Sequence, residues 1–437
     1  MREEITGATN ALEDNLQAAT GKRALLVGAD TGEDADFEHS MEELKSLAEA
    51  CDRQVAGIIT QRLETVNKAL YIGSGKVAEV KEFAALCEAE EVIFDNTLSP
   101  SQIRNLGREL ELPVMDRTNL ILDIFDVRAQ SREAKLQVEA ARLQYMLPRL
   151  VGMYEALGRQ GGASGSMSNK GVGEKKLELD RRRIEHRIGE LRRELGEIAQ
   201  NRVTQRKRRS RSKVPQVALV GYTNAGKSTV MNHMVEQFGS LPEKQVLEKD
   251  MLFATLETNV RRIDAGDNRP FFLADTVGFI HKLPHGLVQA FRSTLEEIKY
   301  ADLLVQVVDF SDENHRRQME VTAQTLKELD AGDIPRIIVY NKADKCSMQE
   351  LPRVCDRQIY MAASRNIGIW ELADMIKERL YADYVDCHFL IPYDKAGVAS
   401  YFMENATVHE KEYGEEGIRL FVNCDSQDAA KYGIFKV

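Results

Sequence analysis

The sequence has 437 residues, of which 43% are hydrophobic and 29% are charged, and its formal net charge is −10. This length predicts two to four domains, and the acidic balance argues against a protein that binds nucleic acid over its whole surface. We expect no membrane span, because no stretch reaches about 18 apolar residues, and no secretory signal, because a polar segment follows Met1. The six cysteines include no C-x-x-C pair, which predicts reduced thiols in a cytoplasmic protein.

Residues 23–127 alternate between apolar runs and helical spacing, after a polar extension over residues 1–22. Such alternation predicts a small parallel sheet with helices between its strands. A glycine turn at residues 73–76 precedes one of the helices, and we interpret it as a helix-entry turn. The alternative, a second site for ATP in residues 23–127, has only this turn in its favour. The predicted strands are residues 24–28, 55–60, 91–95 and 113–117.

Residues 128–213 are predicted to form a helical hairpin with a glycine-rich loop. Apolar spacing predicts one helix over residues 118–153 and another over residues 174–208, and residues 161–173 have the composition of a flexible loop. The second helix ends in a basic run at residues 206–213, with little acid to offset it, and we interpret this run as a contact to RNA phosphates. The alternative is a solvated helix face with Glu–Arg pairs.

An apolar run at residues 217–220 is followed by the pattern G-x-x-x-x-G-K-S and then by helical spacing. This is the strand–loop–helix context of a P-loop, in which backbone N–H groups and a helix N-terminus point at phosphate oxygens. Lys227 is predicted to reach the β- and γ-phosphates, and the Ser228 hydroxyl is predicted to bind Mg²⁺. The predicted phosphate-binding residues are Gly221, Tyr222, Thr223, Asn224, Ala225, Gly226, Lys227 and Ser228.

The pattern N-K-x-D follows another apolar run, residues 337–340, and so lies at a predicted strand end, where α/β sheets bind ligands. Asp344 can accept hydrogen bonds from N1–H and the 2-amino group of guanine. Adenine has neither donor, so a desolvated carboxylate here predicts GTP rather than ATP. The predicted guanine-binding residues are Asn341, Lys342, Ala343 and Asp344.

A third motif, D-x-x-G, follows the apolar run at residues 271–274. Asp275 is predicted to hold Mg²⁺ through water, and the N–H of Gly278 to meet the γ-phosphate. Three motifs in this order predict a P-loop GTPase domain over residues 214–381, and residues 382–437 are predicted to form a small α+β domain. The predicted fold class is therefore α/β. The residues of the third motif are Asp275, Thr276, Val277 and Gly278.

Several longer motifs resemble the HflX family of GTPases, over about residues 23 to 395. They are residues 72–76, 94–100, 116–125, 134–139, 253–256 and 275–280. The resemblance implies a cytoplasmic GTPase that binds the large (50S) ribosomal subunit and its rRNA, and that separates stalled or idle ribosomes.

The resemblance also assigns roles to two further segments. Thr255 matches the switch I threonine that joins Ser228 on Mg²⁺, and it lies among Phe253, Ala254, Leu256 and Glu257. The loop that supports the guanine base matches Ala362, Ala363 and Ser364, although the family usually has Ser where Ala362 stands.

Two departures from the family pattern concern loops. Residues 170–176 lack the arginine and proline of the usual R-G-P-G-E-T element, and residues 257–259 replace a frequent D-P-T.

The residue after the third motif is Phe279, where many GTPases have a glutamine that orients the attacking water. We therefore predict slow intrinsic hydrolysis, with Lys227 and the N–H of Gly278 stabilising the transition state. Asn224 stands where some related GTPases hold K⁺ beside the phosphates, and a loop-stabilising asparagine is the alternative. Two rival functions remain open: a GTP-dependent signalling switch on a protein or membrane surface, and an RNA-remodelling nucleotidase. We expect a monomer.

Overall fold

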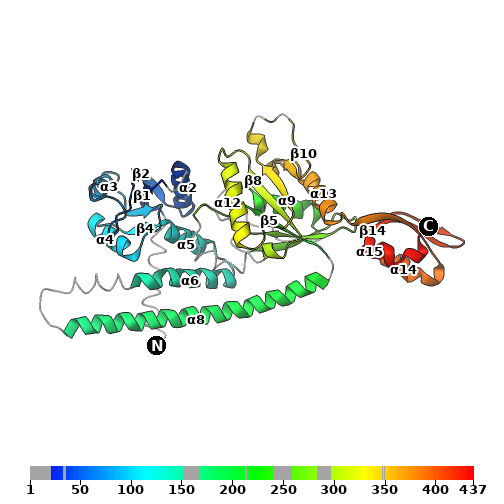
Figure 1. Cartoon of the computed structure of the whole chain (residues 1–437), viewed down its shortest axis with the longest axis horizontal. Helices are drawn as coiled ribbons and strands as arrows, with labels where there is room; N and C mark the ends of the chain where they lie inside the picture. The colour runs from blue at the N-terminus through cyan, green and yellow to red at the C-terminus, as the bar shows by residue number, and fades with distance from the viewer. Residues whose placement is uncertain are drawn as a thin grey trace. The chain divides into compact units, whose positions relative to one another are not determined.

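The computed structural model of the chain describes residues 21–32, 36–150, 168–211, 214–239, 258–282, 297–346, 348 and 350–437 (Figure 1). In the helix that spans residues 168–211, side chains are described only for residues 178–201. The chain divides into two compact units. The first comprises Met1–Arg202, Met251–Leu256 and His281–Arg292, and the second comprises Val203–Asp250, Glu257–Ile280 and Ser293–Val437.

The first unit contains the predicted parallel α/β domain. Its four strands lie in the order β2-β1-β3-β4 and all pair in parallel. The central strand β1 is buried on both faces, as a parallel strand covered by helices on each side must be. The elements are β1 (Arg23–Asp30), α2 (Phe37–Ala50), β2 (Gln54–Arg62), α3 (Ser74–Leu86), β3 (Glu91–Phe94), α4 (Pro100–Leu110), β4 (Val114–Asp116) and α5 (Arg117–Arg128).

A buried ion cluster connects helices α2 and α5 to the end of strand β3. Arg117 binds Glu43 and donates to Asp95 at 2.6 Å, while Lys282 donates to Asp95 at 2.7 Å and to Ser40 at 2.9 Å. Burial alone would raise the pKa of Asp95, but the positive charges of Arg117 and Lys282 hold that pKa below its ordinary value. The cluster is therefore charged and mutually compensated, which is what a buried carboxylate requires.

A helical pair follows, but its helices differ from the prediction at two points. The predicted helix over residues 118–153 is wrong as one element, because α5 ends at Arg128 and α6 (Arg132–Met146) begins after Ser131, whose hydroxyl accepts from the N–H of Ala134 at 3.1 Å. A side chain that caps a helix N-terminus favours a new start over continuation. A short 3₁₀ turn, η1 (Leu147–Arg149), extends α6.

The second helix of the pair, α8 (Ser168–Arg211), is longer than predicted. The part of the predicted glycine-rich loop at residues 168–173 is helical, because extending an existing helix adds one hydrogen bond per residue and offsets the cost of about 1 kcal/mol per glycine. The remainder of that loop, residues 161–167, lies outside the described residues. Helices α6 and α8 pack through Leu136, Ala140 and Leu191, and Arg187 pairs with Glu139 at 2.8 Å.

The second unit is built on a seven-stranded sheet in the order β10-β11-β9-β8-β5-β7-β6. Strands β6 and β10 are antiparallel to their neighbours and the others pair in parallel. Because β5 pairs with β8 on one side and β7 on the other, its carboxyl end is a topological switch point, where α/β sheets bind ligands. The strands are β5 (Gln216–Gly221), β6 (Asn259–Ile263), β7 (Phe271–Asp275), β8 (Leu303–Asp309), β9 (Arg336–Asn341), β10 (Arg353–Cys355) and β11 (Gln358–Tyr360).

Helices cover both faces of this sheet, as Figure 1 shows. Helices α9 (Lys227–Phe238) and α13 (Ile369–Leu380) share one apolar core with the strands, which includes Val230, Met234, Ile369 and Ile376. Helix α12 (His315–Glu328) packs against β5 and β8, and its buried residues do not belong to that core. The predicted P-loop GTPase fold is therefore confirmed. Two short turns complete it, η2 (Ala343–Lys345) and η3 (Ala363–Arg365).

A small α+β domain ends the chain, as predicted. Its antiparallel sheet has the order β12-β14-β13 and buries Phe389 and Val422 against Phe402 of α14. Among the described residues, no helix combines the length and the apolar character needed to span a bilayer. The elements are β12 (Tyr384–Ile391), η4 (Tyr393–Lys395), α14 (Ala396–Asn405), β13 (Thr407–Gly414), β14 (Gly417–Asp425), α15 (Ser426–Lys431) and η5 (Gly433–Phe435).

Candidate nucleotide-binding site

Four predicted segments converge at the carboxyl ends of neighbouring strands in the second unit. The P-loop follows β5, residues 275–278 lie at the end of β7, residues 341–344 at the end of β9, and residues 362–364 just after β11. Strand β5 pairs in parallel with β7, strand β9 pairs in parallel with β11, and β8 pairs in parallel with both β5 and β9. All four carboxyl ends therefore lie at the same edge of the sheet.

The P-loop itself is a tight turn between β5 and α9. Gly226, the residue before the helix, has φ 94°, and a side chain there would overlap the amide of Asn341. Only glycine fits such a position, because it has no Cβ and tolerates positive φ. Helix α9 begins at Lys227, so its first N–H groups, which have no partner within the helix, face the turn.

Lys227 is held inside this turn. Its Nζ donates to the carbonyl of Tyr222 at 2.7 Å and to that of Gly221 at 3.2 Å, and the residue is 6% exposed. Burial lowers the pKa of Lys227 to about 8, against the opposing effect of Asp275, which raises it. An ammonium that is desolvated, and whose hydrogen bonds with the described residues go to carbonyls and not to carboxylates, is suited to an anionic ligand.

Ser228 and Asp275 form the second part of the site. The Ser228 hydroxyl donates to Oδ2 of Asp275 at 2.8 Å, and Asp275 is fully buried. A hydroxyl beside a carboxylate provides the hard oxygen atoms that Mg²⁺ prefers, so these residues fit that metal. The next residue, Thr276, donates its hydroxyl to the carbonyl of Leu219 at 2.6 Å and thereby fixes the loop to β5.

Gly278 and Phe279 lie against the P-loop. A side chain at Gly278 would be only 2.8 Å from Cα of Thr223 and 3.0 Å from Nζ of Lys227. Phe279 accepts from the N–H of Thr223 at 2.8 Å and donates its own N–H to the carbonyl of Gly221 at 3.1 Å. The sequence predicted only that Phe279 lacks a polar side chain; the pairing of its backbone with the P-loop has no signal in the motif.

Asn341 connects three of the segments. Its Nδ2 donates to the carbonyl of Ala225 at 2.9 Å, and its Oδ1 accepts from the N–H of Ala363 at 2.9 Å. Ala362 and Ala363 are fully buried, whereas Ser364 is exposed. Asn341 therefore orders the loop that follows β11 as well as the P-loop.

Asp344 is placed to receive hydrogen bonds. Its Oδ1 atom is buried and has no hydrogen-bond partner among the residues that the structure describes. Its Oδ2 is 3.9 Å from the exposed guanidinium of Arg365. Buried carboxylate oxygens are costly unless they are paired, so this atom is adapted to donors from a ligand.

Sequence reasoning missed one contributor to this site. Asp309 ends strand β8, and its Oδ2 lies 2.8 Å from Nζ of Lys342, whose backbone has φ 58°. The ion pair holds Lys342 along the loop that carries Asp344. The only available signal was the position of Asp309 at the end of a predicted strand.

Some predicted site residues lie outside the described part of the chain. They are Phe253, Ala254, Thr255, Leu256 and Glu257. The side chains of the basic run at residues 206–213 are also outside it, although α8 extends to Arg211.

Three family models match the chain in order. One described as GTP-binding GTPase N-terminal matches residues 38–126, and one described as GTP-binding GTPase Middle Region matches residues 128–209. The third, described as 50S ribosome-binding GTPase, matches residues 216–342.

Similar proteins extend over almost the whole chain. A protein named GTPase HflX from Caldanaerobacter subterraneus subsp. tengcongensis is 42% identical over 409 residues, which cover 93% of this chain and 92% of that protein. The GTPase HflX of Escherichia coli strain K12 is 38% identical over 403 residues, or 91% of either chain. A solved GTP-binding protein from Sulfolobus solfataricus, in complex with GDP, is 26% identical over 82% of this chain and 98% of its own, with a TM-score of 0.42. This chain therefore belongs to the HflX family of GTPases.

Proposed function

We propose that this GTPase reads the guanine base with Asp344 and holds the phosphates with the P-loop. The observation that carries the proposal is the buried Oδ1 of Asp344, which has no partner among the described residues and lies on the loop that Asn341 ties to the P-loop. Guanine offers N1–H and the 2-amino group to such an acceptor, and adenine offers neither. Ala362, Ala363 and Ser364 would support the base from the neighbouring loop.

The phosphate end of the site is proposed to use a lysine and a metal. In the structure, Nζ of Lys227 donates hydrogen bonds to two backbone carbonyls. When a nucleotide binds, this group would turn to the β- and γ-phosphates. Ser228 and Thr255 would bind Mg²⁺ directly and Asp275 through water, as supported by the 2.8 Å contact of Ser228 with Asp275. When bound, the metal would neutralise phosphate charge. The role of Thr255 and its neighbours is an inference from the family.

The proposed reaction is attack of water on the γ-phosphorus, which breaks the bond to the β-phosphate oxygen and yields GDP and phosphate. Lys227 and the N–H of Gly278 would stabilise the charge that builds up on the transferred group. Phe279 is 2% exposed and its ring has no hydrogen-bonding atom, so it does not position the water. Intrinsic hydrolysis should therefore be slow until another group completes the site.

A monovalent cation is one such group. Asn224 is exposed, has φ 59°, and its side chain makes no hydrogen bond with the described residues, which speaks against a purely loop-stabilising role. We propose that its carbonyl oxygen contributes to a K⁺ site beside the phosphates. Phosphate release should be faster in K⁺ than in Na⁺, and equal rates would reject the cation.

The proposed partner is the large (50S) ribosomal subunit. The family model that matches residues 216–342 carries the description 50S ribosome-binding GTPase, and the basic run at residues 206–213 is a candidate contact to rRNA. We propose that the chain acts in the cytoplasm, as a monomer, and splits or rescues stalled or idle ribosomes. We also propose that the domains of the chain end at residues 22, 127, 213 and 381.

Stimulation of hydrolysis by large subunits tests this function. Phosphate release from GTP should rise at least about tenfold when purified large subunits are added, because the bound ribosome supplies or orders the missing catalytic group. ATP in place of GTP should give no release. An unchanged rate with subunits present would contradict the partner, and release from ATP would contradict the assignment of Asp344.

A further inference from the structure

One face of the GTPase sheet is left partly uncovered. Strands β9 and β11 are adjacent and parallel, and such a crossover usually contains a helix. In the described part of this crossover the chain instead forms the turn η2 and strand β10, which pairs with β11. The burial of β9 alternates accordingly: Ile337 and Val339 lie in the core, whereas Arg336, Ile338 and Tyr340 are only half-buried.

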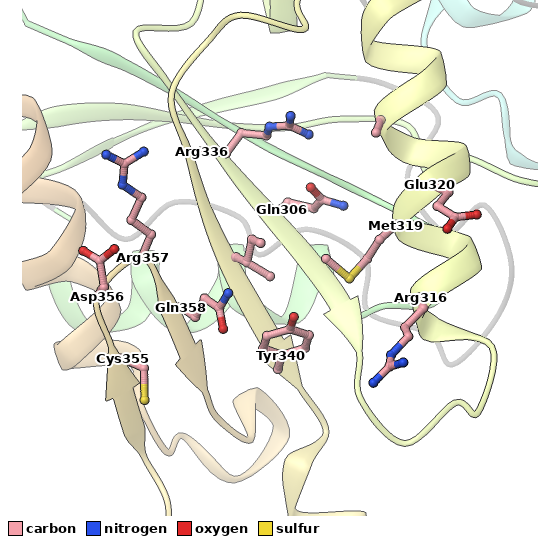
Figure 2. Close-up of a pocket in the computed structure, with 12 residues that line it drawn as sticks. Gln306, Arg316, Met319, Glu320, Arg336, Tyr340, Cys355, Asp356, Arg357 and Gln358 are labelled. Carbon is pink, nitrogen blue, oxygen red and sulfur yellow. The ribbon is translucent and has the colours of Figure 1, made fainter.

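A cavity of about 640 Å³ lies over β9 and β11, between helix α12 and strand β10 (Figure 2). Helix α12 forms one wall, and strands β10 and β11 the other. Met319, Ala323 and Ile338 contribute apolar surface to its lining. Figure 2 shows Arg336 at one end of the hollow, with Tyr340 and Arg316 at the other.

The charge of the lining favours an acidic occupant. Arg316, Arg336 and Arg357 all line the hollow, and none of them makes an ion pair with another described residue. The acidic Asp356 is already paired with Arg379 at 2.9 Å, which leaves Glu320 as the opposing charge in the lining. Three guanidinium groups at one hollow are suited to carboxylates, which they bind in a bidentate manner.

The aromatic side chains argue for a protein occupant over a nucleic acid. Tyr340 stacks on Tyr360 with 4.7 Å between ring centroids, and Phe310 packs edge-on against both rings. The stacking covers one face of Tyr340 and so limits the platform that this ring offers to bases. Covering the apolar side chains of Met319 and Ile338 with a phosphate backbone would give no favourable burial free energy. Covering them with apolar side chains of a protein would.

The dimensions match a short helix. Arg336 and Tyr340 are four residues apart in β9, which corresponds to about 13 Å at about 3.3 Å per residue. A helix of about nine residues has this length. Neighbouring strands are spaced by about 4.8 Å, so the strip from β9 to β10 is about as wide as one helix.

We propose that this hollow is the docking site for an acidic amphipathic helix of a protein partner. The apolar side of that helix would cover Met319, Ala323 and Ile338, and its carboxylates would pair with the three arginines. The site lies on a sheet face, and none of its lining residues belongs to the four segments of the nucleotide site, so docking and nucleotide binding can be measured separately.

A designed peptide pair tests the proposal with the full-length chain. The probe is a fluorescent peptide of about 18 residues with leucine at one helical face and glutamate elsewhere, and its twin has lysine in place of glutamate. Anisotropy measures binding, and methyl NMR signals of Met319 and Ile338 localise it. A uridine oligonucleotide tests RNA as the occupant. The charge-reversal variant combines R316E and R357E, and R353E on exposed β10 is a single-reversal control outside the lining.

The acidic peptide should shift the methyl signals of Met319 and Ile338, and the reversal variant should bind it at least about tenfold more weakly. The control R353E should change affinity less than about twofold, and the lysine twin should gain affinity for the reversal variant. Equal GTP hydrolysis in all variants would show that each is folded. The proposal is overturned if the acidic peptide does not shift these signals, if charge reversal leaves its affinity unchanged, or if only the oligonucleotide binds there.

Discussion

A single carboxamide organises the guanine end of the site. Asn341 donates to the P-loop at Ala225 and accepts from the loop after β11 at Ala363, so one side chain orders two ligand-binding loops. Neither contact involves the base. We therefore propose that the first residue of N-K-x-D acts on affinity by positioning the two loops, and that Asp344 discriminates between bases.

Replacing the carboxylate of Asp344 should change which base is bound. In Asp344→Asn, one acceptor becomes an N–H donor, which clashes with the 2-amino group of guanine but matches the 2-oxo group of xanthine. We expect GTP affinity to fall at least about 100-fold and xanthosine triphosphate to bind instead, since an unpaired buried polar group costs about 1–3 kcal/mol or more. Competition with a fluorescent nucleotide measures both affinities. Unchanged preference for GTP would show that Asp344 does not read the base.

Lys227 should couple GTP binding to proton uptake. Its pKa without nucleotide is about 8 because of burial, whereas adjacent phosphates would raise the pKa by stabilising the charged form. Above about pH 8 the free protein has lost part of this proton and must regain it on binding, so affinity should fall as pH rises through this range. Calorimetry at pH 8.5 in buffers of different ionisation enthalpy measures the uptake. The coupling would be contradicted if no protons were taken up or if protons were released. The variant Lys227→Arg should show no proton uptake.

The strand, turn and helix around the P-loop could be predicted because they depend on local spacing. The P-loop is eight residues of strand, turn and helix, so its shape follows from Gly226 and its neighbours alone. The contacts of Asn341 join positions 116 and 22 residues apart, and the pair of Asp309 with Lys342 joins the end of β8 to the loop after β9. Such contacts depend on which strands become neighbours in the sheet, which no local pattern encodes.

At the scale of elements, a capping residue decided where one helix ends and another begins. Apolar positions on both sides of residues 129–131 predicted one helix, but apolar spacing carries no information on whether the backbone stays helical at each residue between them. Ser131 has extended backbone and caps α6. The converse error occurred at α8, where glycines suggested a loop and the helix nevertheless begins at Ser168. Helix ends depend on such local competition and are hard to read from periodicity.

Removal of this cap should loosen the start of α6. Ser131→Ala deletes the acceptor for the N–H of Ala134, at an expected cost of about 1 kcal/mol. Hydrogen exchange followed by mass spectrometry should show about fivefold faster exchange in the first turn of α6. Ser74→Ala is the matched control. Ser74 is the first residue of α3, and the capping position of that helix is Gly73, so no side-chain capping bond is lost. Equal effects of the two substitutions would mean that the Ser131 cap has no specific role.

At the scale of the whole molecule, loss of the γ-phosphate is expected to change partner affinity. The N–H of Gly278 and the hydroxyl of Thr255 are the groups proposed to sense that phosphate, directly and through the metal. We predict that the chain pellets with large ribosomal subunits at least about tenfold better with a non-hydrolysable GTP analogue than with GDP. Equal pelleting with both nucleotides would contradict a GTP-dependent cycle on the ribosome.

We propose that Asp344 and the P-loop together select a guanine nucleotide. Titration calorimetry of the full-length chain with GTP, GDP and ATP in the presence of magnesium measures this selection. We predict one site per chain that binds GTP and GDP, with ATP at least about 1,000-fold weaker because adenine leaves the buried Oδ1 of Asp344 unpaired. Binding of ATP as tight as that of GTP, or no heat with either guanine nucleotide, would contradict the account.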